Sequence, residues 1–329
     1  MKLLIITNNP TRASFRQRVE VHLDLLKAGQ ITCEVAKFPS GSVARFRLLK
    51  RCCDFDAVFL HKKRLNPIDA MWLRKYGRMV IYDFDDAVMY DDKDPGKTSR
   101  KRQKSFARTV KLADAVIAGN DYLAEHAKGS NPGVTVLPTG LDVAAYRPEV
   151  KRADDGKVRL VWIGSRSTLK YLTDISPALE QVAQRFDNVV LRVICDDFFS
   201  LEKMPVEKCT WSLASQCIDL AGGDIGLAPL PDDPFARGKC GFKILQYAAS
   251  ALPVVTSPVG VNADLVRDGV TGYHASDVEE WVDRIGRLVE DRQLRQRMGQ
   301  ANLKMGEDFD LKKIGQRLSE IILPCGGKS

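Results

Sequence analysis

The sequence predicts an α/β protein with two parallel sheets, each covered by helices. Short apolar strands alternate with longer amphipathic segments along the chain, which is the pattern of β–α units on a parallel sheet. The series of β–α units occurs once in each half of the chain, which predicts two Rossmann-like domains. The length of 329 residues agrees, because single hydrophobic cores rarely grow beyond about 250–300 residues.

Apolar runs mark the expected strands of each half. In the first half these runs are Lys2–Thr7, Ile31–Phe38, Asp56–His61, Met79–Phe84, Ala115–Ala118 and Val134–Pro138. In the second half they are Val158–Gly164, Val189–Ile194, Cys209–Trp211, Asp224–Leu230, Pro253–Ser257 and Gly272–Ala275. Between the halves, the segment 142–156 is rich in charge and poor in apolar residues, so we expect an exposed linker with a boundary near Val150.

Three helices are expected to end the chain, over Val278–Glu290, Asp291–Glu307 and Asp310–Leu323. The last one carries an apolar stripe suited to docking on another surface, made of Leu311, Ile314, Leu318, Ile321 and Ile322. We therefore divide the chain into a first domain over residues 1–150, a second over 151–309, and a final helix and tail over 310–329.

Composition indicates a soluble globular protein, with 44% hydrophobic and 28% charged residues. No apolar run approaches the ~18 residues of a membrane-spanning helix, and the N-terminus lacks the apolar region of a signal peptide. The eight cysteines include no Cys-x-x-Cys pair and the four histidines are scattered, which argues against a structural zinc site. A cytoplasmic protein with reduced thiols is expected.

The basic excess lies in the first half of the chain. Residues 1–147 hold 26 Lys and Arg against 16 Asp and Glu, whereas residues 148–329 hold 24 against 26. One cluster, Arg45-Phe46-Arg47-Leu48-Leu49-Lys50-Arg51, interleaves charge with apolar residues, so it fits either a solvated face or contact with an anionic membrane. No nucleic-acid-binding signature accompanies the charge, and we expect no nucleic-acid partner.

A glycine and lysine loop stands where a helix of the second half is expected to begin. Gly238, Lys239, Gly241 and Lys243 would bring backbone N–H groups, the positive helix end and two ammonium groups together. Such a loop suits an anion such as a diphosphate, and it also fits a plain glycine-rich connection with solvated lysines.

The loop and its surroundings resemble the donor-binding half of retaining glycosyltransferases of the GT-B fold, family 4. The resemblance rests on the stretch DIGLAPLPDDPFARGKCGFKILQYAASALPVVTSP, residues 224–258, and is weaker at the N-terminus. It implies two Rossmann-like domains facing a cleft, with the last helix crossing back to the first domain. It also implies a nucleotide-sugar co-substrate, no cofactor and no required metal.

The resemblance further implies donor-binding residues in the second half. The family has Gly-Arg after the first strand of this half, where this chain has Gly164 and Ser165; Arg166 and Lys170 would then grip the diphosphate. Helix capping by Ser165, with Arg166 exposed, is the alternative. The family's two glutamates correspond to Gly238 and Gln246, and an amide such as Gln246 can accept from a ribose hydroxyl.

Two motifs of the first half are candidates for acceptor binding. Asp83, Asp85 and Asp86 follow a strand end, where loops of open α/β sheets hold ligands. The family often has a histidine at this strand end. We expect Asp83 and Asp86 to bind acceptor, with Asp85 acting near the reacting sugar. A metal site formed by these carboxylates is the alternative. Arg16 and Arg18, in the first loop and helix, suit an acceptor phosphate or solvent.

The expected function is transfer of a sugar from a nucleotide sugar to a glycan or lipid-linked acceptor with retention, within EC class 2.4. Lys239, Arg166 and Asp85 are the expected catalytic residues. A role in cell-envelope polysaccharide or glycoconjugate synthesis, at the inner face of the membrane, is what the family suggests. A GT-B phosphorylase or epimerase, and a non-catalytic protein that binds nucleotide sugars or membrane surfaces, are the alternatives.

Overall fold

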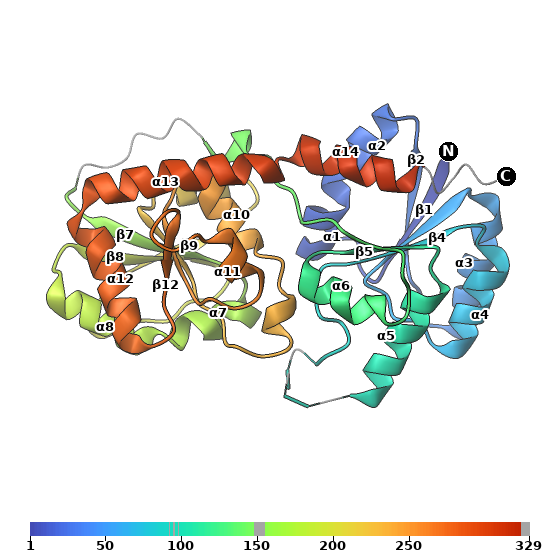
Figure 1. Ribbon diagram of the computed structural model, residues 1–329, viewed down its shortest axis with the longest axis horizontal. Helices are drawn as coiled ribbons and strands as arrows, with labels where there is room; N and C mark the ends of the chain where they lie inside the picture. The colour runs from blue at the N-terminus through green and yellow to red at the C-terminus, as the bar shows by residue number, and fades with distance from the viewer. Residues whose placement is uncertain (92, 95, 98, 148–154, 324–329) are drawn as a thin grey trace. The chain divides into compact units, whose positions relative to one another are not determined.

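Each apolar run singled out in the sequence forms a strand in the computed structural model of the chain (Figure 1). The structure describes residues 1–91, 93–94, 96–97, 99–147 and 155–323. The expected boundary near Val150 and the tail after Leu323 lie outside these residues. Most strands match their expected range within a few residues, but Val206–Thr210 begins three residues earlier than expected.

The chain folds into two units. The first contains residues 1–140, 233–240 and 311–329, and the second contains residues 141–232 and 241–310. Residues 233–240 were expected in the second domain and pack in the first unit instead. The expected linker also differs, because Val143 and Tyr146 are buried in the core of the second unit.

The first unit is built on a parallel six-stranded sheet with the order β2-β1-β3-β4-β5-β6. Its strands are β1 (Lys2–Thr7), β2 (Thr32–Lys37), β3 (Ala57–His61), β4 (Val80–Phe84), β5 (Ala115–Ala118) and β6 (Val134–Val136). Its helices are α1 (Ala13–Arg18), α2 (Leu23–Ala28), α3 (Ser42–Lys50), α4 (Pro67–Tyr76), α5 (Arg100–Leu112), α6 (Asp121–Lys128) and α14 (Leu311–Ile322). Short 3₁₀ turns span Glu20–His22, Arg51–Asp54 and Ala236–Gly238.

Alternation along the central strand divides the core of the first unit into two layers. Leu4 and Ile6 of β1 face the layer that includes α3, α4, α5 and α6, whereas Leu3 and Ile5 face α1, α2 and α14. The apolar stripe of α14 enters this second layer, with α14 beside α2 (Figure 1). The approach is close, because a Cβ on Gly315 would lie 2.9 Å from Nδ1 of His22.

The second unit has a parallel six-stranded sheet with the order β12-β11-β10-β7-β8-β9. Its strands are β7 (Val158–Ile163), β8 (Val189–Cys195), β9 (Val206–Thr210), β10 (Ile225–Ala228), β11 (Val254–Thr256) and β12 (Gly272–His274). Its helices are α7 (Arg166–Thr173), α8 (Ser176–Arg185), α9 (Gln216–Ala221), α10 (Phe242–Ala249), α11 (Val261–Leu265), α12 (Val278–Glu290) and α13 (Arg292–Gly306). Short 3₁₀ turns span Ala144–Tyr146 and Glu307–Phe309.

Each sheet contains one point at which the strand order reverses direction. Renumbered within its own unit, the second sheet has the order 6-5-4-1-2-3 typical of Rossmann folds, and its reversal lies between β10 and β7. The first sheet has a flavodoxin-like order, and its reversal lies between β1 and β3. In open α/β sheets ligands bind beyond the carboxyl ends of the strands at such points, so a ligand-binding position is expected at the reversal in each unit.

Candidate functional site

Tyr247 holds the second sheet together where its strand order reverses. Its hydroxyl accepts a hydrogen bond from the Ile163 N–H on β7 at 3.2 Å and donates to the Leu227 carbonyl on β10 at 2.9 Å. The side chain comes from α10 and is completely buried. It therefore satisfies backbone groups of both strands at the edge of the sheet where a ligand is expected.

The turn from β7 into α7 is fixed by a tryptophan beneath it. A Cβ on Gly164 would lie 2.3 Å from Cη2 of Trp162, so the backbone passes too close to the indole for any other residue. Ser165 is the N-cap of α7, and the Thr168 hydroxyl accepts its N–H at 3.2 Å. The capping role considered for Ser165 is present, and it leaves the start of α7 facing the point of reversal.

Two of the expected diphosphate-binding cations lie at the exposed surface of α7. The Arg166 side chain forms an ion pair with Asp197, with 3.1 Å between Nε and Oδ2, and is 70% exposed. Its N–H donates to the Asp196 carboxylate at 2.9 Å, and that bond holds the pKa of Asp196 below its usual value. Lys170 is exposed one turn further along. A carboxylate at the helix start thus takes one of the amides that an incoming anion would use.

The glycine and lysine loop is divided between the two units. Gly241 caps α10 with a left-handed φ of +65°, and a Cβ there would also lie 2.5 Å from Cδ1 of Leu265. Lys243 places its ammonium 4.0 Å from the centroid of the Trp162 ring, in a cation–π contact at the end of β7. These residues belong to the second unit, whereas Gly238 and Lys239 belong to the first.

Gln246 is buried rather than presented to a ligand. Its amide nitrogen donates to the Tyr146 hydroxyl at 3.0 Å, and Oε1 of Gln216 lies 3.4 Å away. Only 5% of the residue is exposed. In this structure the Gln246 amide nitrogen ties α10 to the first turn of the second unit and to α9, and the amide oxygen expected to accept from a ribose belongs to an almost inaccessible side chain.

Residues 233–240 are held to the carboxyl edge of the first sheet. The Asn120 amide donates to the Lys239 carbonyl at 2.9 Å, and a Cβ on Gly238 would lie 2.6 Å from that of Ala87. Cys240 donates from Sγ to the Asp85 carbonyl at 3.2 Å. Burial raises the pKa of the Cys240 thiol, which keeps it protonated and unreactive.

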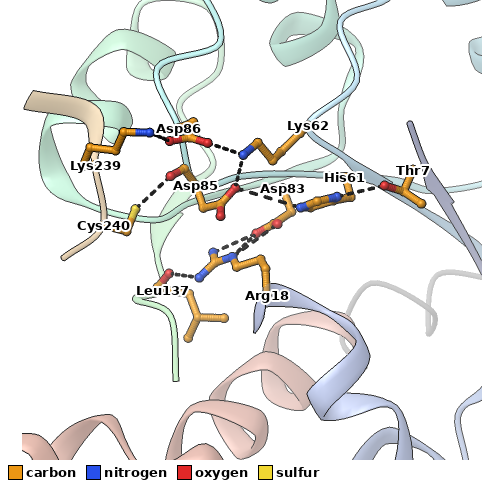
Figure 2. A network of polar contacts seen from close by, with 10 residues as sticks. All are labelled: Thr7, Arg18, His61, Lys62, Asp83, Asp85, Asp86, Leu137, Lys239 and Cys240. Carbon is orange, nitrogen blue, oxygen red and sulfur yellow. Dashed lines mark hydrogen bonds and ion pairs between the residues drawn. The ribbon is translucent and has the colours of Figure 1, made fainter. Parts of the chain in front are cut away.

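Two lysines neutralise the carboxylates that follow β4, as Figure 2 shows. Lys62 contacts both neighbours: its Nζ lies 3.0 Å from Oδ1 of Asp85, and it forms an ion pair with Asp86. Lys239 reaches the other oxygen of Asp86 at 2.9 Å. Burial opposes the charge on Asp86, but the two lysines hold its pKa well below the usual range. Lys62 adopts a left-handed φ of +54°, which is strained for a lysine and common at functional sites.

Arg18 and Asp83 form a buried ion pair. The guanidinium donates to Oδ1 of Asp83 from Nε at 3.0 Å and from a terminal nitrogen at 2.8 Å, and it also donates to the Leu137 carbonyl at 2.7 Å. Both side chains are nearly inaccessible. The pair links α1, β4 and the segment after β6, so both residues have a structural role that their expected acceptor binding did not include. Arg16, two residues earlier, donates to the Thr11 carbonyl at 3.3 Å.

His61 is a site residue that the sequence interpretation missed. It ends β3 beside Thr7, which ends β1, and Nδ1 lies 3.1 Å from the Thr7 hydroxyl. Nε2 faces Oδ1 of Asp85 at 4.0 Å (Figure 2). Burial lowers the pKa of His61, so the imidazole is neutral near pH 7. The signal was present, since Thr7 and His61 are polar residues at the ends of two buried strands that could pair in parallel.

The carboxylates at the end of β4 and just after it face cations rather than one another. Asp83 contacts Arg18, Asp85 contacts Lys62, and Asp86 contacts Lys62 and Lys239. Within the described residues, no group of three or more His, Cys, Asp or Glu side chains is placed to hold a metal ion. The arrangement can present carboxylate oxygens that are already charge-balanced and fixed in position.

Known proteins resemble the chain in part of its sequence and in fold over nearly its whole length. A family model described as group 1 glycosyl transferases matches residues 216–291. The D-inositol 3-phosphate glycosyltransferase of Nocardia farcinica is 24% identical over 189 residues, which are 50% of this chain and 42% of that protein. The chain thus matches less than half the length of that curated relative.

Two solved structures show the same fold at low sequence identity. HepE from Anabaena, in complex with UDP and glucose, has a TM-score of 0.72 and 16% identity over 98% of this chain and 100% of its own. Sucrose-phosphate synthase from Thermosynechococcus elongatus has a TM-score of 0.76 and 12% identity over all of both chains. The solved structures confirm the expected GT-B fold, and the family model confirms the expected resemblance to group 1 glycosyltransferases over residues 216–291.

Proposed function

We propose that this chain, a group 1 glycosyltransferase of the GT-B fold, transfers a sugar from a nucleotide-sugar donor to a glycan or lipid-linked acceptor with retention of configuration. The observation that carries the proposal is the cationic carboxyl edge of the second sheet. There Lys243 contacts Trp162 at the end of β7, and the helix that follows this strand carries Lys170 and Arg166, which is paired with Asp197. Lys243 also lies within the segment that matches the family model.

The cations of the second unit suit the departing diphosphate. Sugar transfer passes through an oxocarbenium-like state in which negative charge grows on the leaving group. Preorganised cations stabilise that charge most when it develops. Lys243 is held over the Trp162 ring at the end of β7, and the exposed Arg166 and Lys170 lie on α7, the helix that follows this strand. We assign the diphosphate to these groups.

Lys239 has a different role in this proposal. Sequence reasoning grouped it with the diphosphate-binding residues, but its ammonium contacts Asp86 in the first unit. We propose that Lys239, together with Lys62, positions the Asp86 carboxylate. Asp86 keeps 24% of its side chain exposed and Asp85 keeps 14%, and these two carboxylates are proposed to receive acceptor hydroxyls.

The donor is proposed to be a UDP-sugar. HepE, which shares the fold, was solved with UDP and glucose. A glycan or lipid-linked acceptor of the cell envelope, bound by the first unit at the inner face of the membrane, remains the proposed acceptor. No cofactor or metal is part of the proposed reaction.

Nucleotide binding by the full chain tests the proposal directly. Isothermal titration should show that UDP binds to the chain, and titration with other nucleoside diphosphates measures the preference for UDP. The double variant Arg166→Gln/Lys170→Gln should weaken it about tenfold or more, because charge-assisted phosphate contacts are lost. The matched control Arg297→Gln/Lys304→Gln removes two exposed cations from α13 and should bind as the wild type.

Product analysis with UDP-sugars then separates the enzyme classes. Release of UDP only with acceptor present supports a glycosyltransferase. Sugar phosphate formed from inorganic phosphate would indicate a phosphorylase, and an isomerised donor would indicate an epimerase. A correctly folded chain that binds no nucleotide diphosphate contradicts the proposal and favours the non-catalytic alternative.

A further inference from the structure

The first unit carries two helical stripes of the same design. Residues three and four positions apart lie on one side of a helix, so each stripe forms a continuous surface. The stripe of α3 consists of Val43, Phe46, Arg47 and Lys50. The stripe of α4 consists of Ile68, Met71, Trp72 and Lys75. We call these eight residues the α3–α4 face.

The two stripes adjoin. The Phe46 and Trp72 rings meet edge to face with centroids 5.0 Å apart, and Phe46 also contacts Tyr76 at 6.2 Å. Figure 1 shows α3 and α4 side by side in the first unit. The α3–α4 face is therefore one surface with an aromatic centre.

Large apolar side chains on this face are exposed to water. Val43 is 67% exposed, Ile68 56% and Met71 58%. Single exposed apolar residues are ordinary, but three around a half-buried aromatic pair form a patch, and such patches mark interaction sites.

The charges beside the apolar centre are all positive. Arg47, Lys50 and Lys75 are exposed on the α3–α4 face. Asp69 is the acidic residue within these two helices; it is buried, 3.3 Å from an Arg45 guanidinium nitrogen. The basic cluster seen in the sequence is thus divided, because Arg45 contacts Asp69 and Arg51 contacts Glu34.

We propose that the α3–α4 face binds an anionic membrane surface. An interfacial helix places apolar side chains among the acyl chains and lysines at the headgroups, and both stripes have this order. The charge complements an anionic lipid rather than a neutral one. No helix among the described residues is long and apolar enough to cross a bilayer.

Vesicle sedimentation with the full chain tests the surface. Binding to phosphatidylglycerol vesicles should exceed binding to phosphatidylcholine vesicles and should weaken as salt rises. Arg47→Gln/Lys50→Gln should weaken binding about fivefold for each charge removed and flatten the salt dependence. Ile68→Ser/Met71→Ser should weaken binding about tenfold or more while the salt dependence remains.

Controls use the same substitutions on the second unit. Ile218→Ser/Val270→Ser removes two exposed apolar side chains, 52% and 48% exposed, and should leave vesicle binding unchanged. Arg297→Gln/Lys304→Gln is the charge control. Brominated lipid should quench the fluorescence of Trp72 when the chain binds vesicles. Trp72→Phe should therefore remove most of the fluorescence that brominated lipid quenches.

Three outcomes would overturn the proposal. The first is equal binding to neutral and anionic vesicles. The second is an unchanged affinity for the α3–α4 variants. The third is a dimer in solution that Ile68→Ser/Met71→Ser converts to a monomer without any vesicle binding, which would assign the face to a second copy of the chain. Each outcome is independent of nucleotide binding.

Discussion

The two units bury different kinds of polar side chain. Among the described residues of the first unit, five acidic or basic side chains are buried: Arg18, His22, His61, Asp69 and Asp83. In the second unit the buried polar side chains that the structure describes are uncharged: Gln216, Gln246, Ser250, Thr256, Ser257, Asn262, Thr271 and Asn302. The expected cations of the second unit, Arg166 and Lys170, lie instead at its surface.

This difference separates structural charge from ligand-binding charge. A buried ion pair is costly to desolvate and persists only with good geometry, so the charges of the first unit are committed to one another. Arg166 and Lys170 are exposed, and the Arg166–Asp197 pair is solvated, with side chains 70% and 46% exposed, so it can exchange its carboxylate for another anion at little cost. This difference supports the proposal that the second unit binds phosphate, whereas ion pairs fix the carboxylates of the first unit.

The largest expected effect comes from breaking the buried pair of the first unit. Asp83→Ala would leave the Arg18 guanidinium buried without its carboxylate, and we expect a loss of about 3–5 kcal/mol in the free energy of unfolding. Hydrogen exchange followed by mass spectrometry in urea reports the loss for each unit separately.

Glu34→Ala is the matched control for this prediction. Glu34 pairs with Arg51 at 2.9 Å, but the two side chains are 45% and 51% exposed, so its removal should cost under about 1 kcal/mol. Arg18→Met/Asp83→Leu should recover much of the stability, since no buried charge remains. Equal losses for Asp83→Ala and Glu34→Ala would show that the buried pair is not structural.

Local sequence patterns predicted the strands well, but they could not give the contacts of the candidate site residues. A buried parallel strand is an apolar run closed by turn residues, so twelve strands could be placed without tertiary information. The Arg18–Asp83 pair joins residues 65 positions apart, and no spacing rule connects them. The loop from Gly238 to Lys243 was treated as one site because its residues are adjacent in sequence, yet it crosses from one unit to the other after Cys240.

A second prediction compares the two lysines of that loop. Lys243→Ala should lower kcat/KM for sugar transfer by about 10²–10³, the range for removing one preorganised electrostatic contact in the transition state. Lys239→Ala should have a smaller effect, because Lys62 still neutralises Asp86. Steady-state kinetics with the identified donor measures both, and Lys304→Ala on α13 is the control.

The reverse order would restore the interpretation made from the sequence. If Lys239→Ala loses more activity than Lys243→Ala while the fold is intact, Lys239 is the diphosphate-binding residue. The assignment of phosphate binding to the second unit alone would then be wrong.

A third prediction concerns pH, because only the first unit buries histidines. The pKa of His22 is lowered from 6.5 to about 4, mainly because the side chain is buried and to a lesser extent because Arg18 lies nearby. Between those values the unfolded chain binds a proton that the folded chain does not, so stability falls as pH drops. At pH 5 the loss from His22 is about 2 kcal/mol. Hydrogen exchange at pH 7 and pH 5, corrected for intrinsic rates, should show it in the first unit.

His22→Leu should remove most of that pH dependence. The substitution eliminates the ionisation and the Nδ1 atom, which is buried without a hydrogen-bond partner. The remaining part should come from His61, whose pKa is also lowered by burial. A second unit that loses as much stability as the first on acidification would contradict the comparison.

The smallest expected effect tests the uncharged interior of the second unit. Tyr247→Phe keeps the buried ring but removes the hydroxyl that joins Ile163 on β7 to Leu227 on β10. Because the Ile163 N–H is then buried without a partner, the free energy of unfolding should fall by about 1–3 kcal/mol. The loss should be the same at pH 7 and pH 5, since no charge is involved. UDP affinity should fall with it, because the two strands carry the turns that form the proposed diphosphate site. Unchanged stability with Tyr247→Phe would mean that water or a shifted strand replaces the hydroxyl. The uncharged link in the second unit would then be dispensable for stability, unlike the Arg18–Asp83 pair of the first unit.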